Sequence, residues 1–171
     1  MIKKLQLRVN RDKSSVDRPW RRKFLGFSFT SLFKTSIRVH EKSRENLRKK
    51  IKELCRLGRG MNLEKFINEE LNPVISGWGN YFRYADNRSF AKEMDSWIRR
   101  KLRIILWRTW SRAKVRYKKL AERGIPPLKC YMMANSHKGP YRMSCFSAFA
   151  EAYSPQYFQG MGLMSLSWIM R

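Results

Sequence analysis

Apolar residues recur at helical spacing in the first half of the chain, which predicts two amphipathic helices. The first has Ser43 as its N-cap and extends to about Leu57, where a Gly-Arg-Gly segment ends it. The second begins after Asn62, and Pro73 predicts a kink or break near Asn72 because proline removes an amide donor. Their apolar faces consist of Leu47, Ile51, Leu54 and Cys55, and of Leu63, Phe66, Ile67, Leu71, Val74, Ile75 and Trp78.

The same periodicity predicts a third helix that is longer and more regular than the other two. It extends from about Ser89 to Lys114 or beyond, and the residues Asp86 to Ser89 before it are of the kinds that cap helices. Its expected buried face consists of Phe90, Met94, Trp97, Ile98, Leu102, Ile105 and Leu106.

The N-terminal residues 1–36 have the pattern of β-structure. Apolar and polar residues alternate over 5–9, and a second strand is predicted over 24–29, where Gly26 allows a backbone or ligand to approach closely. Residues 37–40 are interpreted as a short extended link. Because two strands alone are marginal in water, we expect this hairpin to need a partner sheet.

Beyond Pro126 and Pro127 the pattern predicts only short helices around a polar, basic loop over 135–142. The predicted fold is therefore mainly α: a three-helix bundle with an N-terminal β-hairpin and a short helical tail. We place the domain boundaries so that residues 1–36 form the hairpin, 37–123 the helical domain and 124–171 the tail.

Charge narrows the possible function. Lys and Arg number 38 against 13 Asp and Glu, a net charge of +25. A compact chain this basic repels itself and requires a polyanion, for which nucleic acid is the leading candidate. A ribosome-like structural RNA binder and a membrane-surface protein are the alternatives. No segment approaches the roughly 20 apolar residues of a membrane span, so we expect no membrane partner.

The residues needed for catalysis or metal binding are sparse. Cys55, Cys130 and Cys145 form no disulfide framework, which favours a reducing intracellular compartment. Cys130, His137 and Cys145 could be metal ligands, but no Cys-x-x-Cys pair supports that reading. The few acidic residues form no metal-binding pair, so we expect no catalytic residue, metal or cofactor in this chain.

Basic helix faces and loop aromatics indicate a nucleic-acid-binding module instead. After Asp95 the third helix has almost no acidic residue among its arginines, which favours contact with phosphates over a lattice of ion pairs. Tyr141, in the basic loop, is suited to stacking on an unpaired base. The predicted nucleic-acid-binding residues are Arg48, Lys49, Lys52, Arg99, Arg100, Arg103, Lys138, Tyr141 and Arg142.

Three motifs resemble the C-terminal part of group II intron-encoded reverse transcriptases, which are also maturases. Phe-Leu-Gly-Phe-Ser-Phe at 24–29 resembles the last block of the palm. Gly-Trp-Gly-Asn-Tyr-Phe-Arg at 77–83, followed by 95–103, resembles the maturase-specific thumb. Ala-Asn-Ser-x-Lys-Gly at 134–139, with Tyr141 where the family commonly has Trp, resembles the tail that follows the thumb.

The resemblance implies a function for each region. The full-length family member copies RNA into DNA with Mg²⁺ and helps its intron RNA fold for splicing. Phe24, Leu25 and Gly26 would form the palm strand near the primer, the thumb arginines would contact RNA or template–primer, and the tail would add contacts. Localisation would be the bacterial cytoplasm or an organelle.

The paired aspartates of the palm are absent from this sequence, so the resemblance implies no polymerase activity for the chain alone. Tyr84-Ala85-Asp86-Asn87 is similar to the Tyr-Ala-Asp-Asp turn of the family's active site. It lies between two predicted helices and lacks the second aspartate, so we interpret it as a helical hinge. The expected function is an RNA-binding maturase module. The alternatives are a polymerase subunit completed by a separate or upstream fingers and palm portion, and a non-functional remnant.

Overall fold

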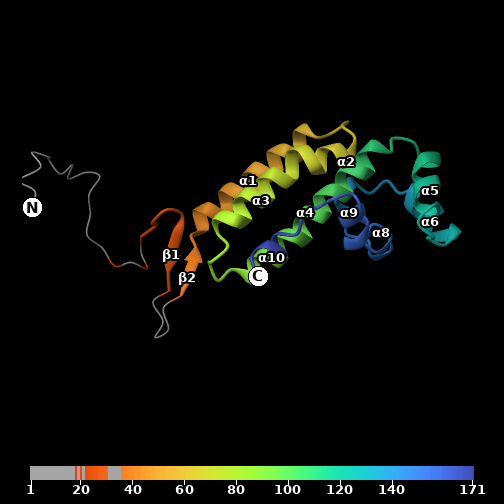
Figure 1. Ribbon diagram of the computed structural model, residues 1–171. Coiled ribbons are helices and arrows are strands. Elements are labelled where there is room, and N and C mark those ends of the chain that lie inside the picture. The colour runs from red at the N-terminus through yellow and green to blue at the C-terminus, as the bar shows by residue number, and fades with distance from the viewer. Residues whose placement is uncertain (1–17, 19, 21, 31–35) are drawn as a thin grey trace, which may run out of the picture.

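The computed structural model describes residues 18, 20, 22–30 and 36–171, and it is mainly helical (Figure 1). Its elements, in order, are β1 (Phe27–Phe29), β2 (Ile37–Val39), α1 (Glu41–Leu57), α2 (Leu63–Lys65), the π-helical turn η3 (Phe66–Leu71), α3 (Asn72–Tyr81), α4 (Arg88–Thr109), α5 (Ala113–Ala121), α6 (Pro127–Ala134), α7 (Pro140–Met143), α8 (Ser147–Ala152), α9 (Pro155–Gly160) and α10 (Leu166–Ile169).

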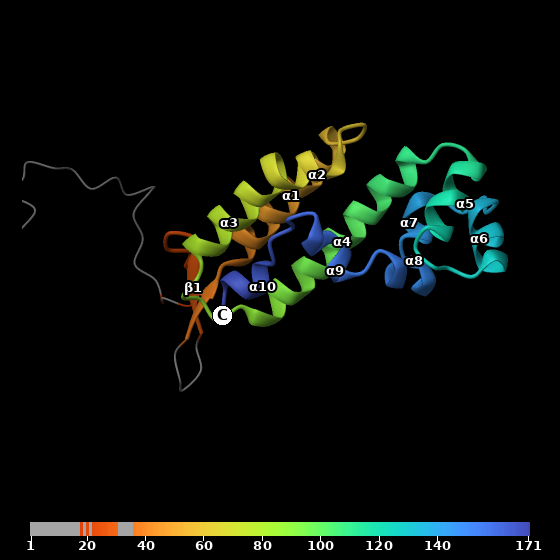
Figure 2. The same cartoon turned by 45° about the vertical axis from the view of Figure 1, so that its right-hand side comes forward.

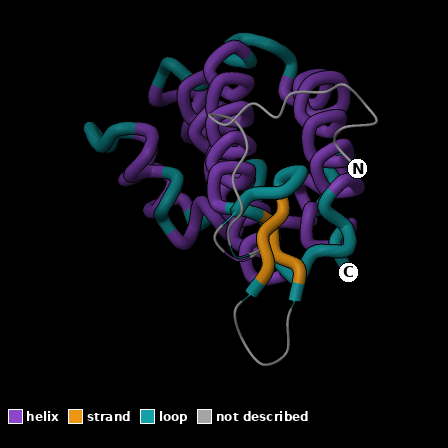
Figure 3. Tube along the Cα trace, turned by 90° about the vertical axis from the view of Figure 1, so that its left-hand side faces the viewer, coloured by secondary structure: helices purple, strands orange, loops and turns teal. Residues whose placement is uncertain are grey.

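Strands β1 and β2 form an antiparallel hairpin at the N-terminal end of the helices (Figure 3). Phe27 pairs with Val39, and Phe29 pairs with Ile37. The interpretation of residues 37–40 as a link was therefore wrong over Ile37–Val39, where β-branched residues alternate with an arginine. The strand predicted over residues 5–9 lies outside the described residues.

The hairpin is joined directly to the first helix. Helix α1 begins at Glu41 rather than after Ser43, and its N-cap is His40, whose Nδ1 accepts a hydrogen bond from the backbone N–H of Lys42. The Ser43 hydroxyl, predicted to be the N-cap, instead donates to the carbonyl of Gly26 at 3.1 Å. A Cβ atom at Gly26 would lie 3.0 Å from the ring of Phe82, so a side chain approaches this glycine closely, rather than the backbone or ligand that was predicted.

The second helical segment is continuous but changes its winding. Asn62 caps it as predicted, because its side-chain oxygen accepts hydrogen bonds from two backbone amides of the first turn. The winding widens before Pro73, and the N–H of Asn72 donates to the carbonyl of Ile67, five residues earlier. The predicted disturbance near Asn72 is thus a π-helical turn, which accommodates the missing amide of proline without breaking the helix.

Helix α4 ends at Thr109, earlier than the predicted Lys114. Trp110 follows the last residue of the helix and has a non-helical backbone conformation. Its side chain is buried against Phe149 and Tyr153. Arg116 stabilises the turn, because its Nε donates to the carbonyl of Trp110 at 2.8 Å.

Helices α1, α3 and α4 form the predicted three-helix arrangement, with the hairpin at one end and α5–α8 at the other (Figure 2). The tail then returns along α4 and places α10 against both α3 and α4. A Cβ atom at Gly79 of α3 would lie 2.9 Å from Cγ2 of Ile169, so glycine permits this close packing. The predicted apolar faces meet in the core between these helices.

Candidate nucleic-acid interface

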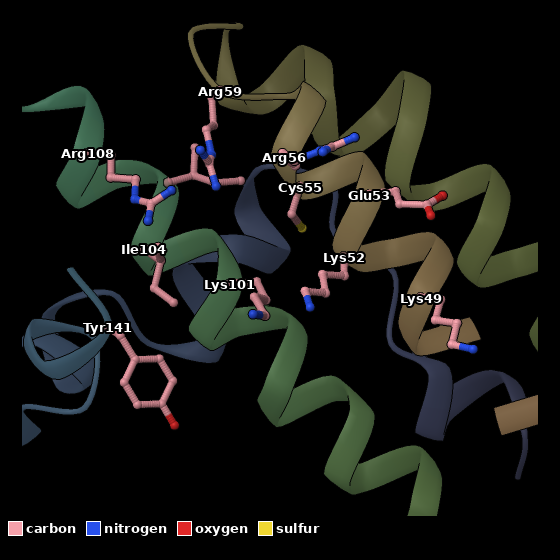
Figure 4. Close-up of a pocket in the computed structure, with 11 residues that line it drawn as sticks. Lys49, Lys52, Glu53, Cys55, Arg56, Arg59, Lys101, Ile104, Arg108 and Tyr141 are labelled. Atoms are coloured by element: carbon pink, nitrogen blue, oxygen red, sulfur yellow. The ribbon is translucent and has the colours of Figure 1, made fainter. Parts of the chain in front are cut away.

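A cleft of about 450 Å³ lies between the C-terminal halves of α1 and α4 (Figure 4). Its position follows from the packing of the two helices. Their apolar faces meet in the core, and residues at the edge of that contact, most of them polar, line the cleft. The lining residues are Lys49, Lys52, Glu53, Cys55, Arg56 and Arg59 of α1 and the loop that follows it, Lys101, Ile104, Ile105 and Arg108 of α4, and Tyr141 of α7.

The cleft is strongly cationic. Six of its lining side chains are Lys or Arg, and Glu53 is the single carboxylate among them. Lys52 and Lys101 line the cleft from opposite helices, and the side chains of Arg59 and Arg108 lie together at one end (Figure 4). The Lys101 ammonium lies 5.0 Å from the centre of the Trp97 ring on its own helix. Cations that line one cleft repel one another, so binding of a phosphate chain would relieve the repulsion and release counterions.

Cys55 lies beside these cations but is chemically protected. Burial raises the pKa of its thiol to about 11, although Lys101 acts in the opposite direction. A thiol with so high a pKa holds little thiolate at neutral pH and is a poor nucleophile or metal ligand. The described residues contain no group of three His, Cys, Asp or Glu side chains placed to hold a metal ion.

Tyr141 extends the site beyond the two helices. Its side chain is 60% exposed and lines both the cleft and a shallower neighbouring hollow. Lys138, Arg142, Cys145 and Phe146 complete that hollow, and the Lys138 ammonium lies 4.8 Å from the centre of the Phe146 ring. The Tyr141 ring lies between the cationic cleft and this hollow. It is therefore placed to stack on a base while a neighbouring phosphate of the same RNA strand lies in the cleft or in the hollow.

The structure brings five of the nine predicted nucleic-acid-binding residues to this surface: Lys49, Lys52, Lys138, Tyr141 and Arg142. Arg48 lies elsewhere on α1, where it forms a 2.7 Å ion pair with Glu93 and lies over the ring of Phe90. That ion pair is partly exposed and contributes little to stability.

The three arginines predicted on α4 are not in the cleft. Arg99 and Arg100 are half-buried, and Arg99 lines a small hollow beside the tail. Arg103 was predicted to be a surface contact, and this was wrong, because the residue is only 9% exposed. Its guanidinium donates to the carbonyls of Ser144 at 3.2 Å and Tyr153 at 3.3 Å. Burial, with repulsion from Arg99 and Arg100, lowers the pKa of Arg103 from its ordinary value.

The predicted primer-side residues lie at the other end of the structure. Phe24 and Leu25 are 67% and 68% exposed, whereas Gly26 is buried beneath Phe82. They lie by the hairpin, at the N-terminal end of α1. Tyr81 is also near, because its hydroxyl donates to the carbonyl of Leu25 at 3.0 Å. No part of the cleft is formed by this segment.

The predicted nucleic-acid-binding residues did not include four cations of the cleft: Arg56, Arg59, Lys101 and Arg108. Arg56 and Arg108 were recognised only as part of the basic helix faces. Helical spacing was the available signal. Lys49, Lys52 and Arg56 follow one another at intervals of three and four residues, and Lys101 and Arg108 are seven residues apart. Each pattern places its cations on one side of a helix, but only the packing of α1 against α4 brings the two sides together.

Comparison with known proteins identifies the family. A family model described as group II intron, maturase-specific domain matches residues 44–124. No curated protein sequence matches the chain significantly. The match includes all of α2–α5, most of α1 and every residue that lines the cleft except Tyr141. Within the described residues, no helix has the length and apolar character needed to cross a membrane.

Residues 44–124 are therefore a group II intron maturase-specific domain, and the resemblance to the C-terminal part of group II intron-encoded reverse transcriptases is confirmed. This domain supports a group II intron maturase role, and it implies group II intron RNA as a partner.

Proposed function

We propose that the cleft between α1 and α4 binds the phosphate backbone of group II intron RNA and thereby assists folding and splicing of the intron. One observation carries this proposal: within the maturase-specific domain, six cations from two helices and the loop after the first converge on one cleft with a single carboxylate. Cations fixed on helices and presented from two sides fit a folded RNA, whose backbone approaches from more than one direction.

Tyr141 adds a contact that phosphate binding alone does not provide. Its ring lies between the cleft and the hollow lined by Lys138 and Arg142. An unpaired base at a loop or bulge could stack there while flanking phosphates occupy the cations. This arrangement favours RNA with structured helices interrupted by unpaired residues over a uniform duplex.

Binding to the intron and to an unrelated RNA distinguishes this function from general attraction between opposite charges. The affinity of the full chain is measured for a group II intron RNA and for a shuffled RNA of equal length, at several salt concentrations. We expect tighter binding to the intron, retained at the higher salt concentrations, where the charge contribution is weakened. Equal affinity for both RNAs at every salt concentration would show that the protein binds RNA only through its positive charge, without preference for the intron.

A second function, as part of an RNA-directed DNA polymerase that holds template–primer, is favoured by the exposed hairpin segment. Phe24 and Leu25 present two large apolar side chains to solvent next to Tyr81, which is 55% exposed and whose hydroxyl donates to the carbonyl of Leu25. Such a patch is typical of a surface covered by another chain or domain. Mixing the protein with separately produced fingers and palm should then give primer extension. The absence of extension in that mixture would exclude the polymerase role.

We also propose a reducing intracellular location, either the bacterial cytoplasm or an organelle. All three cysteines are free, and Cys55 and Cys130 are buried in positions where no disulfide forms. Fractionation of the source cells, followed by immunodetection, tests this assignment.

A further inference from the structure

A second cationic recess, of about 640 Å³, lies where the N-terminal end of α4 faces the C-terminal segment. It shares no lining residue with the cleft between α1 and α4. Arg88 and Lys92, one helical turn apart on α4, supply cations from one side, and Arg171 supplies another. None of the lining side chains is a carboxylate.

Trp168 lines this recess and is 67% exposed. It belongs to α10, which is held in place on both sides of this residue. Leu166 is buried, and Asp95 accepts a hydrogen bond from its backbone N–H at 2.8 Å. Ile169 packs against Gly79 of α3. The indole is therefore presented on a fixed backbone, although the core does not require its apolar surface.

An exposed indole among cations suits one class of ligand. Nucleobases offer a π-face for stacking on Trp168, and the phosphates on either side of a base would contact Arg88 and Lys92. Gln159 and Ser167, also in the lining, can form hydrogen bonds with the edge of a base. A lipid surface fits less well, because no other large apolar side chain lines the recess.

We propose that this recess binds an unpaired nucleotide of RNA, whose base stacks on Trp168 while the adjacent phosphates contact Arg88 and Lys92. The proposal rests on the proposed function, because the intron RNA bound in the cleft would supply the unpaired segment. It assigns the two surfaces different ligands: the cleft takes the backbone of folded RNA, and the recess takes a single unpaired residue.

Fluorescence anisotropy of two labelled RNAs tests the assignment, with a 12-nucleotide oligouridylate as the unpaired ligand and a blunt 12-base-pair duplex. Trp168→Ala should weaken binding of oligouridylate about tenfold, because one stacked base is lost. It should leave the affinity for duplex unchanged. Trp168→Phe keeps an aromatic face and should retain most of the affinity. Tyr131→Ala is the matched control, since Tyr131 is 64% exposed but lies outside the recess.

The cleft variant Lys52→Glu/Lys101→Glu separates this proposal from the proposed function. If intron RNA binds this variant normally while Trp168→Ala still weakens oligouridylate, the role of the cleft fails and the recess stands. If Trp168→Ala weakens both short RNAs equally, or neither, the recess does not bind an unpaired base. Unchanged oligouridylate affinity together with lost sedimentation on phosphatidylserine vesicles would overturn the proposal and assign Trp168 to a membrane surface.

Discussion

The carboxylate of Asp95 accepts a hydrogen bond of 2.8 Å from the backbone N–H of Leu166, which is 71 residues further along the chain. The same carboxylate accepts from the N–H of Ser167 at 3.0 Å and from the hydroxyl of Ser165 at 2.7 Å. A side chain of α4 thus satisfies the first amides of α10, as an N-cap residue would. Asp95 thereby ties the C-terminal segment to the maturase-specific domain, together with Asn68 and Asn72, which hydrogen-bond to the backbone of residues 161–164.

Asp95→Ala should destabilise the protein by about 3 kcal/mol, because it leaves buried donors unpaired. The free energy of unfolding is measured with urea, and hydrogen exchange should show lost protection over residues 165–170. Asp86→Ala is the control, because Asp86 is exposed and its side chain caps no helix in the structure. Unchanged stability and unchanged protection in Asp95→Ala would show that this contact does not hold the tail.

Arg103→Met should cost about 2–3 kcal/mol, because the carbonyls of Ser144 and Tyr153 lose a charged donor. Its RNA affinity, measured where the variant is folded, should be unchanged. Arg100→Met on the same helix, which removes a half-buried cation, should cost less stability. The opposite result for Arg103→Met, with normal stability and weakened RNA binding, would restore the role first predicted for this arginine.

Cysteine reactivity should follow burial. At pH 8 iodoacetamide should modify Cys145, which is exposed, and leave Cys55 and Cys130 unmodified in the folded protein. Mass spectrometry of peptides measures the three sites, and urea-unfolded protein, in which all three should react, is the control. Rapid modification of Cys55 in the folded state would contradict the burial that protects it.

The same burial predicts a dependence of stability on pH. The folded pKa of Cys55, about 11, is raised above its ordinary value of 9.0, so folding favours the neutral thiol. This contribution is complete below pH 9 and is lost as the pH rises toward 11. Wild type should lose about 1–2 kcal/mol more than Cys55→Val across this interval, measured by urea unfolding. Parallel pH profiles for the two proteins would refute the linkage.

Trp78→Ala should destabilise the helices by about 3 kcal/mol, at the lower end for a tryptophan because the ring is only partly buried. Its ring lies 4.6 Å from that of Phe82 and 5.8 Å from that of Phe90, so it connects α3 to α4. Asp86→Asn, in the segment that resembles a polymerase turn, should change neither stability nor RNA binding. A Trp78→Ala protein that melts like wild type would show that this aromatic contact is dispensable.

Local pattern explains why the helices could be predicted. Apolar periodicity located α1, the segment from α2 to α3, and α4, and it identified core residues such as Ile51 and Leu102. Their ends were less certain. His40 is the N-cap instead of Ser43. The Ser43 hydroxyl donates a hydrogen bond to the carbonyl of Gly26, which lies 17 residues earlier in the chain.

Tertiary partners explain what could not be predicted. Arg103 resembles its neighbours in sequence, but it faces two carbonyls of the tail that lie 41 and 50 residues further on. The basic faces of α1 and α4 were visible, whereas the set of cations that forms the cleft depends on how these helices pack. Pairing of Ile37–Val39 with β1 likewise depends on the chain folding back onto β1, which short alternating segments do not specify.

The salt dependence of intron RNA binding tests the role of the cleft most directly. Lys52→Glu/Lys101→Glu changes two facing cations of the cleft, and Lys118→Glu/Lys129→Glu makes the same change in charge on exposed residues outside it. We predict that the cleft variant lowers the slope of log affinity against log salt by about two and weakens binding more than tenfold, whereas the control changes little. Equal losses in the two variants would contradict a specific cleft and leave only the overall charge of the protein.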